Sequence, residues 1–206
     1  MIAHLRGAML AAALFLSACA TAPESKEAAK PPEVYRVKFE TSKGEFIVEA
    51  TRAWAPGGAD RFHQLVRDGF YNEARFFRVL PGFVVQWGIN GNPKVQELWR
   101  TLEIADDPVK ESNLRGTLTY AKRGPNTRTT QVFVNLRDNA RLDKDGFAPF
   151  GKVISGMEVV EQFYNAYGEV APRGNGPQPD LIQTQGNAYI ERQFPRLDFV
   201  KKAVIL

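Results

Sequence analysis

The sequence predicts a mostly β protein, a closed β-barrel capped by two short α-helices. Short segments in which apolar and polar residues alternate are separated by turns containing Gly or Pro, which is typical of antiparallel strands. Two stretches instead show the three- and four-residue spacing of apolar side chains that an amphipathic helix requires. A chain of 206 residues, 44% of them hydrophobic, is long enough to bury one substantial core. We therefore expect one folded domain.

The N-terminal segment lies outside this predicted fold. His4 and Arg6 precede an apolar run that is too short to span a bilayer, which predicts a signal peptide over residues 1–18. The run ends in Leu-Ser-Ala-Cys, which resembles a bacterial lipobox, so we expect Cys19 to be lipidated and to become the mature N-terminus. Cys19 is the single cysteine, so the mature chain is expected to have no disulfide.

Residues 19–33 are rich in Ala, Pro, Glu, Lys and Ser and have too few apolar side chains to order themselves, which predicts a flexible tether. Ala20 follows the lipobox cysteine. In Gram-negative lipoproteins an Asp at this position commonly marks retention in the inner membrane, so Ala favours the outer membrane. We expect a lipid-anchored protein of the bacterial cell envelope that faces the periplasm.

The folded domain, residues 34–206, begins with a predicted hairpin and a helix. Apolar and charged residues alternate over 35–40 and, after a Ser-Lys-Gly turn, a second strand is predicted over 45–50. The apolar residues of 62–66 share one helical face, and Gly69 is suited to end that helix.

Two short strands joined by a Pro-Gly turn are predicted between Phe76 and Gln86. Pro81 presets φ for the second turn position, and Gly82 accepts the positive φ that the third position of a type II turn needs. Arg78 does not fit this apolar stretch, because Arg is seldom buried without a partner. Taken alone, it is explained by a side chain whose charged head reaches solvent from a strand edge.

The rest of the domain continues in short elements. Further strands are predicted over residues 116–121, 132–135, 146–153 and 199–205, although the last would also suit a helix. A second helix is predicted over 157–164, and 166–193 is expected to be a long loop rich in Gly, Pro, Gln and Asn. The pair Asp106–Asp107, within 91–108, is expected to be a solvated turn and not a metal site, because no third ligand stands nearby.

Charge and composition argue against several classes of function. The formal net charge is +4 and the basic residues are scattered among acidic ones, so no nucleic-acid surface is predicted. His63 is the one histidine after the signal segment, and it lies on the first predicted helix. We therefore expect no metal centre, no cofactor and no Ser-His-Asp system.

Three ordered motifs resemble the cyclophilins, peptidyl-prolyl cis-trans isomerases with an eight-stranded antiparallel β-barrel. The family's signature Phe-x-Arg-x-x-Pro-Gly-Phe-x-x-Gln is met from Phe76 to Gln86. A Gly-Pro-Asn-Thr loop followed by Gln-x-Phe is met by residues 124–133, and Phe-Gly-Lys-Val by 150–153. The resemblance extends from Val34 to the C-terminus and implies a cyclophilin-like fold.

The resemblance also implies roles for particular residues. Arg78 matches the family's catalytic arginine, and Gln86 would orient it and hold a substrate carbonyl. Arg141 stands where relatives have Trp, which offers the family's inhibitor cyclosporin a hydrogen-bond donor and an apolar rim. Phe147 stands where many relatives have His, so the pocket stays apolar. The other implied substrate-binding residues are Phe83, Val84, Phe133 and Leu142 in the proline slot and Ala121, Lys122 and Gln131 in the groove beside it.

An X-Pro bond rotates over a barrier of ~18–20 kcal/mol because twisting breaks amide resonance. A donor aimed at the prolyl nitrogen binds the twisted state better than the planar one, which lowers the barrier. Arg suits this task, since its donors form a fixed fork that is always charged. We expect a monomeric isomerase acting on proline-containing segments of folding envelope proteins. A proline-binding module or holdase with little turnover, and a purely structural envelope lipoprotein, are the alternatives.

Overall fold

The computed structural model describes residues 30–206, so the predicted signal peptide, Cys19 and most of the tether lie outside the described residues. The strands are β1 (Val34–Thr41), β2 (Gly44–Thr51), β3 (Arg78–Leu80), β4 (Val84–Trp87), β5 (Thr117–Tyr120), β6 (Val132–Asn135), β7 (Pro149–Ser155) and β8 (Val200–Ile205). The helices are α1 (Pro56–Arg67), α2 (Pro93–Trp99), α3 (Arg141–Lys144), α4 (Met157–Val160), α5 (Pro179–Gln185) and α6 (Asn187–Gln193).

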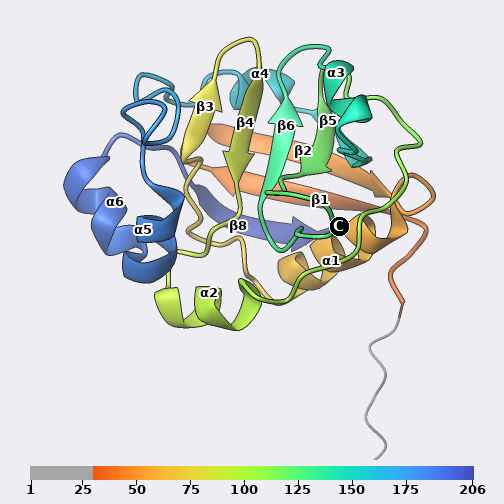
Figure 1. Cartoon of the computed structure of the whole chain (residues 1–206), viewed down its shortest axis with the longest axis horizontal. Helices are drawn as coiled ribbons and strands as arrows, with labels where there is room; N and C mark the ends of the chain where they lie inside the picture. The colour runs from red at the N-terminus through yellow and green to blue at the C-terminus, as the bar shows by residue number, and fades with distance from the viewer. Residues whose placement is uncertain (1–29) are drawn as a thin grey trace, which may run out of the picture.

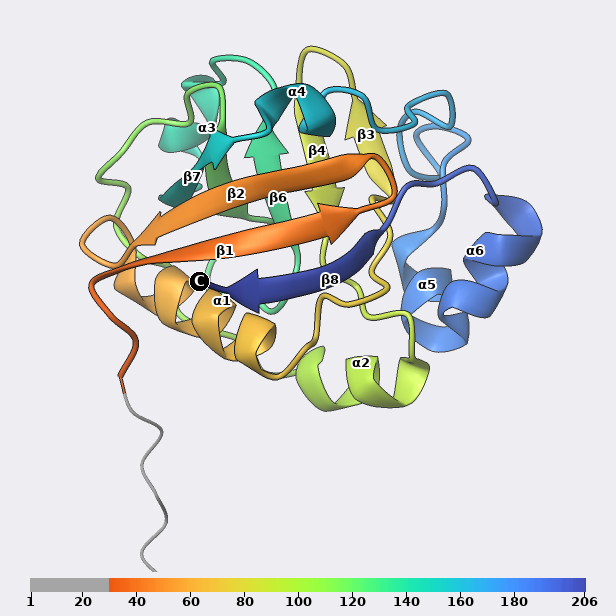
Figure 2. The ribbon, with the colours of Figure 1, turned by 180° about the vertical axis from the view of Figure 1, so that it is seen from behind.

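All eight strands belong to one antiparallel sheet in the order β3-β4-β6-β5-β7-β2-β1-β8, which curls into a barrel (Figures 1 and 2). The edge strands β3 and β8 do not pair as a ladder. Instead Phe76 N donates to Asp198 O at 3.0 Å and Val200 N to Ala74 O at 3.0 Å, beside one isolated bridge. The predicted barrel is confirmed, but irregular backbone closes it, because β3 begins only at Arg78, after the residues that meet the chain at β8.

Both predicted hairpins are present. β1 and β2 pair from Val34–Thr51 to Thr41–Gly44, as the alternation of their apolar residues requires. Between β3 and β4, Gly82 has φ 67° and Phe83 N donates to Leu80 O at 2.9 Å. The Pro-Gly sequence therefore forms the expected tight turn, which fixes the register of the two strands on either side of it.

Aromatic side chains fill the barrel. Phe39 and Phe46 stack with ring centroids 4.8 Å apart, and Trp87 meets Phe39 edge-on at 5.7 Å. Phe76 stacks on Phe163 at 3.9 Å, which joins the segment before β3 to the chain after α4. Such pairs add specific geometry to the burial of large apolar area.

The structure contains four helices beyond the two that the sequence predicts. α1 and the single-turn α4 occupy the predicted positions, but residues 166–193 are not the expected loop, since they contain α5 and α6. Ile182 and Tyr189 from these helices pack with Phe77 and Ile89 in a second apolar cluster beside the β3 edge of the sheet (Figure 1). Each helix has only seven residues, too few for a helical period to stand out.

The Asp106–Asp107 pair is also not the solvated turn that the sequence predicts. The carboxylate of Asp107 accepts from two backbone amides in the first turn of α1, at 3.0 and 2.9 Å, where it complements the helix dipole. It also accepts from Arg128 at 3.0 Å, and the Arg128 side chain is only 4% exposed. Asp106 binds Lys122 Nζ at 2.9 Å. These buried ion pairs fasten the segment after α2 to the barrel.

Candidate active site

The β3–β4 hairpin places two polar side chains on its outer face. Arg78 and Gln86 are register partners, while their neighbours Val79 and Val85 are partners whose side chains enter the barrel core. Arg78 Nη1 donates to Gln86 Oε1 at 3.1 Å, and Gln86 Nε2 donates to Gln131 Oε1 at 3.0 Å. The alternation of a pleated strand thus explains how an Arg stands within an apolar sequence without entering the core.

A cavity of about 350 Å³ opens beside these groups, and we call it the slot. One wall is apolar, since the rings of Phe133 and Phe147 meet there edge-to-face with centroids 5.9 Å apart. Arg78 also approaches an aromatic ring, because its guanidinium carbon lies 5.5 Å from the centroid of the Phe83 ring. Its volume suits a proline ring with its adjoining peptide groups. The predicted site residues that line it are Arg78, Phe83, Val84, Gln86, Ala121, Lys122, Phe133, Leu142 and Phe147.

Two predicted site residues do not line the slot. Arg141 begins α3 and is exposed, with its guanidinium carbon 5.0 Å from the centroid of the Phe83 ring, which lines the slot. The charged head keeps its water at the rim of the slot, and a substrate contact of Arg141 stays a prediction. Gln131 reaches the slot only through its hydrogen bond with Gln86.

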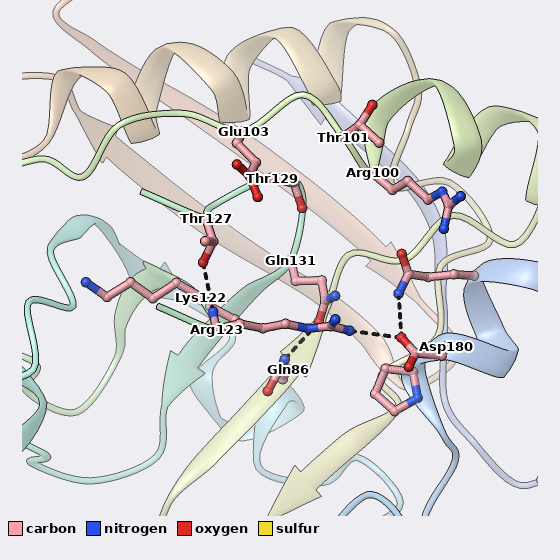
Figure 3. Close-up of a pocket in the computed structure, with 13 residues that line it drawn as sticks. Gln86, Arg100, Thr101, Glu103, Lys122, Arg123, Thr127, Thr129, Gln131 and Asp180 are labelled. Carbon is pink, nitrogen blue, oxygen red and sulfur yellow. Dashed lines mark hydrogen bonds and ion pairs between the residues drawn. The ribbon is translucent and has the colours of Figure 1, made fainter. Parts of the chain in front are cut away.

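A second, polar cavity of about 380 Å³ adjoins the slot (Figure 3). Gln131 lines it, and Gln86 and Lys122 line both cavities, so the two lie side by side. Arg123 and Asp180 reach toward each other at 2.9 Å, but both side chains are more than three-quarters exposed, at 77% and 78%. This pair links the loop after β5 to the start of α5.

A further segment, which the sequence does not predict to be part of the site, also lines the slot. Val170, Arg173 and Pro179 line the cavity there. The carboxylate of Glu169 accepts two hydrogen bonds from Arg78, from Nε at 2.6 Å and from Nη2 at 2.7 Å. These bonds hold the pKa of Glu169 below its ordinary value, against the opposing effect of its partial burial. No sequence signal marks this contact, because a single Glu in a Gly- and Pro-rich stretch has no distinguishing pattern.

Residues 30–206 contain no group of three or more His, Cys, Asp or Glu side chains arranged to hold a metal ion. Over the same residues, no helix combines the length and apolar character needed to cross a bilayer. His63, on α1, packs edge-on against Tyr35 at 5.0 Å and lines neither cavity.

Comparisons with known proteins agree with this geometry. The protein-family model for cyclophilin type peptidyl-prolyl cis-trans isomerases matches residues 36–183. The chain is 36% identical over 161 residues to peptidyl-prolyl cis-trans isomerase A of Dickeya dadantii, covering 72% of this chain and 82% of that protein. It is 30% identical over 161 residues to peptidyl-prolyl cis-trans isomerase B of Escherichia coli, covering 71% and 94%. A Cryptosporidium parvum cyclophilin crystal structure has the same fold, with a TM-score of 0.60 at 21% identity, covering 84% of this chain and 98% of that one.

Proposed function

The chain belongs to the cyclophilin family and is a peptidyl-prolyl cis-trans isomerase, and on that premise we propose that Arg78 supplies the hydrogen bond that stabilises the twisted X-Pro bond. The observation that carries this proposal is a guanidinium at the mouth of an apolar slot. A guanidinium has five N–H donors, and among the described residues three of them have partners: Nε and Nη2 at Glu169, and Nη1 at Gln86. One N–H on Nη1 and one on Nη2 remain for a substrate.

The slot is the proposed seat of the proline ring, enclosed by Phe83, Phe133 and Leu142. As the X-Pro bond twists, the nitrogen becomes pyramidal and its lone pair localises, so an N–H of Arg78 binds the twisted state better than the planar one. Gln86 fixes the guanidinium through Oε1, and its amide group is the proposed partner of a substrate carbonyl. Because Arg does not lose its proton, the step needs no proton transfer.

This arrangement can supply the reduction in the rotation barrier that catalysis requires. Uncatalysed rotation takes roughly 10–100 s, and millisecond turnover needs an acceleration of ~10⁴-fold, or about 5.5 kcal/mol. One preorganised donor in a water-poor site is worth about 2.7–4 kcal/mol, and orientation of the bound peptide supplies the rest.

The proposed clients are proline-containing segments of folding envelope proteins, reached by a monomer that is anchored in the outer membrane through Cys19 and faces the periplasm. The lipobox, the signal-like apolar run and the tether composition of residues 19–33 support this proposal.

A prolyl-peptide isomerisation assay tests the role of Arg78. We expect turnover by the purified full-length protein and a loss of about 10²- to 10³-fold in kcat for Arg78→Ala. Arg115→Ala, which removes an exposed Arg that pairs with Glu161, is the matched control and should retain wild-type activity. If the wild-type protein bound prolyl peptides but did not accelerate their isomerisation, the protein would instead be a proline-binding module.

A further inference from the structure

The segment after α4 brings one acidic side chain to the back of Arg78. Glu169 lies 91 residues further along the chain, and its two carboxylate oxygens accept side-on from Nε and Nη2 of Arg78, at 2.6 and 2.7 Å. The Arg78 and Glu169 side chains are only 15% and 24% exposed. A bidentate pair of this kind fixes the plane of the guanidinium as well as its position.

The carboxylate is itself held in place by its own loop. Glu169 Oε1 also accepts from the backbone N–H of Val170 at 2.9 Å. The main chain is fastened as well, since Gly176 N donates to Glu169 O at 2.8 Å. A Cβ on Gly174 or Gly176 would lie 2.4 or 2.8 Å from that same oxygen, so only glycine permits the loop to close around Glu169.

The carboxylate grips Arg78 without filling the slot. Val170 and Arg173, from the same loop, line the slot, whereas Glu169 does not. The slot keeps a volume of about 350 Å³ beside the ion pair. Glu169 therefore occupies the Nε–Nη2 edge of the guanidinium, and Gln86 bonds to Nη1 from another side.

We propose that Glu169 is a positioning residue for the isomerase reaction, which clamps the guanidinium of Arg78 so that its remaining N–H groups face the prolyl nitrogen. This inference rests on the proposed role of Arg78. An Arg side chain has four rotatable bonds, and Gln86 alone supplies one hydrogen bond at one nitrogen. With that single hydrogen bond the guanidinium could still rotate about the bond's axis. The bidentate contact with Glu169 prevents this rotation, and a contact made in the transition state depends on such a fixed orientation.

The test compares full-length wild type, Glu169→Gln and Glu169→Ala in a prolyl-peptide isomerisation assay that separates kcat from KM. Glutamine keeps the shape of the side chain but presents one acceptor in place of two. We expect kcat to fall roughly tenfold to a hundredfold in Glu169→Ala and less in Glu169→Gln, with KM changed less than about twofold. Glu161→Gln, which alters an exposed carboxylate that pairs with Arg115, is the control and should match wild type.

A second readout follows the guanidinium directly. In proton–nitrogen NMR spectra the Nε–H signal of Arg78, assigned by its loss in Arg78→Lys, should be protected from solvent exchange in the wild type. It should lose this protection in Glu169→Ala and lose part of it in Glu169→Gln, while circular dichroism shows the fold unchanged.

Three results would overturn the inference. Wild-type kcat in both Glu169 variants, with Arg78→Ala inactive, would make Glu169 a structural residue and leave the role of Arg78 intact. A rise in kcat/KM would mean that the carboxylate shields Arg78 from substrate. Retained turnover in Arg78→Ala would remove the proposed role of Arg78 itself, and the clamp with it.

Discussion

Arg78 and Gln86 face each other across the β3–β4 hairpin, and a 3.1 Å hydrogen bond joins Nη1 of the first to Oε1 of the second. The Pro81–Gly82 turn fixes this register, so the two side chains meet because of local backbone geometry. The guanidinium that results is planar and is held at two of its edges. Its replacement by another cation therefore tests geometry separately from charge.

Arg78→Lys should lose most of the activity, by at least about 10²-fold in kcat/KM, because an ammonium cannot bond to Gln86 and Glu169 and still direct a planar donor pair at the substrate. The measurement is prolyl-peptide isomerisation, with circular dichroism as the check on folding. Wild-type turnover in this variant would show that a positive charge alone is sufficient and would remove the guanidinium from the central role.

Turnover should be nearly flat between about pH 6 and 9, because no group proposed to act in the slot titrates there. Activity should fall only in acid. The hydrogen bonds from Arg78 lower the pKa of Glu169 most, and the backbone N–H of Val170 lowers it further. The ion pair is therefore complete above the pKa that Glu169 has in the unfolded chain, and it is lost as pH falls through the lower pKa that Glu169 has in the folded protein. The measurement is kcat/KM against pH, and Glu169→Gln should lack this acid limb. A bell-shaped profile centred near neutrality would reveal an acid or base elsewhere.

Arg141→Trp should gain sensitivity to cyclosporin, and the wild type should be poorly inhibited. The guanidinium carbon of Arg141 lies 5.0 Å from the centroid of the Phe83 ring, and the side chain carries a charge that a bound ligand would desolvate. An aromatic contact is worth on the order of 1 kcal/mol beyond its area, so its loss together with that area weakens binding by roughly ten- to a hundredfold. Inhibition titrations of both proteins with one peptide decide the matter. Tight inhibition of the wild type would contradict this interpretation of the rim.

Cys19→Ser should abolish the proposed acylation and leave isomerase activity unchanged, because Cys19 precedes the folded domain in the sequence, at the start of the predicted tether. Intact-mass measurement of protein extracted from membranes checks this prediction. An unmodified mass for the wild type would exclude the lipid anchor and, with it, the proposed outer-membrane location.

Asp107→Ala should destabilise the fold by about 3–5 kcal/mol, because it takes this partner from the Arg128 side chain, which is only 4% exposed, and removes two hydrogen bonds at the start of α1. Urea denaturation measures the change in the free energy of unfolding. Glu161→Ala is the matched control: it removes the carboxylate of an exposed pair with Arg115 and should cost at most about 1 kcal/mol. Equal effects of the two variants would show that burial of the Asp107 pair is unimportant.

Local rules explain which parts of the fold the sequence predicts. Both hairpins follow from two-residue alternation and glycine-containing turns, and those features depend only on neighbours in the chain. The proximity of Arg78 and Gln86 follows in the same way, because both belong to one hairpin. Phe133 and Leu142 reach the slot from distant segments of the chain, and the resemblance to the cyclophilins, not a local pattern, predicts their place there.

Two features that the sequence does not predict are contacts between charged residues far apart in the chain. Glu169 meets Arg78 across 91 residues and Asp107 meets Arg128 across 21, and composition does not reveal that either carboxylate has a partner. The sequence therefore predicts a solvated turn at Asp106–Asp107, and it assigns no role to the loop that holds Glu169. The helices α5 and α6, of seven residues each, are determined by packing against Phe77 and Ile89 more than by their own periodicity.

The β3–β4 hairpin contributes one face to the active site and the other face to the barrel core. Val79 and Val85 face the core in the same ladder that presents Arg78 and Gln86 outward. Side chains alternate with a period of two, so insertion or deletion of a single residue in the turn at Gly82 would exchange the two faces of one strand. A slip of that kind would turn the guanidinium or its amide partner inward and expose Val79 or Val85, whichever lies on the same strand, to water. Evolution can alter the slot by substitution, but insertion or deletion at this turn removes the active site and part of the core in one step.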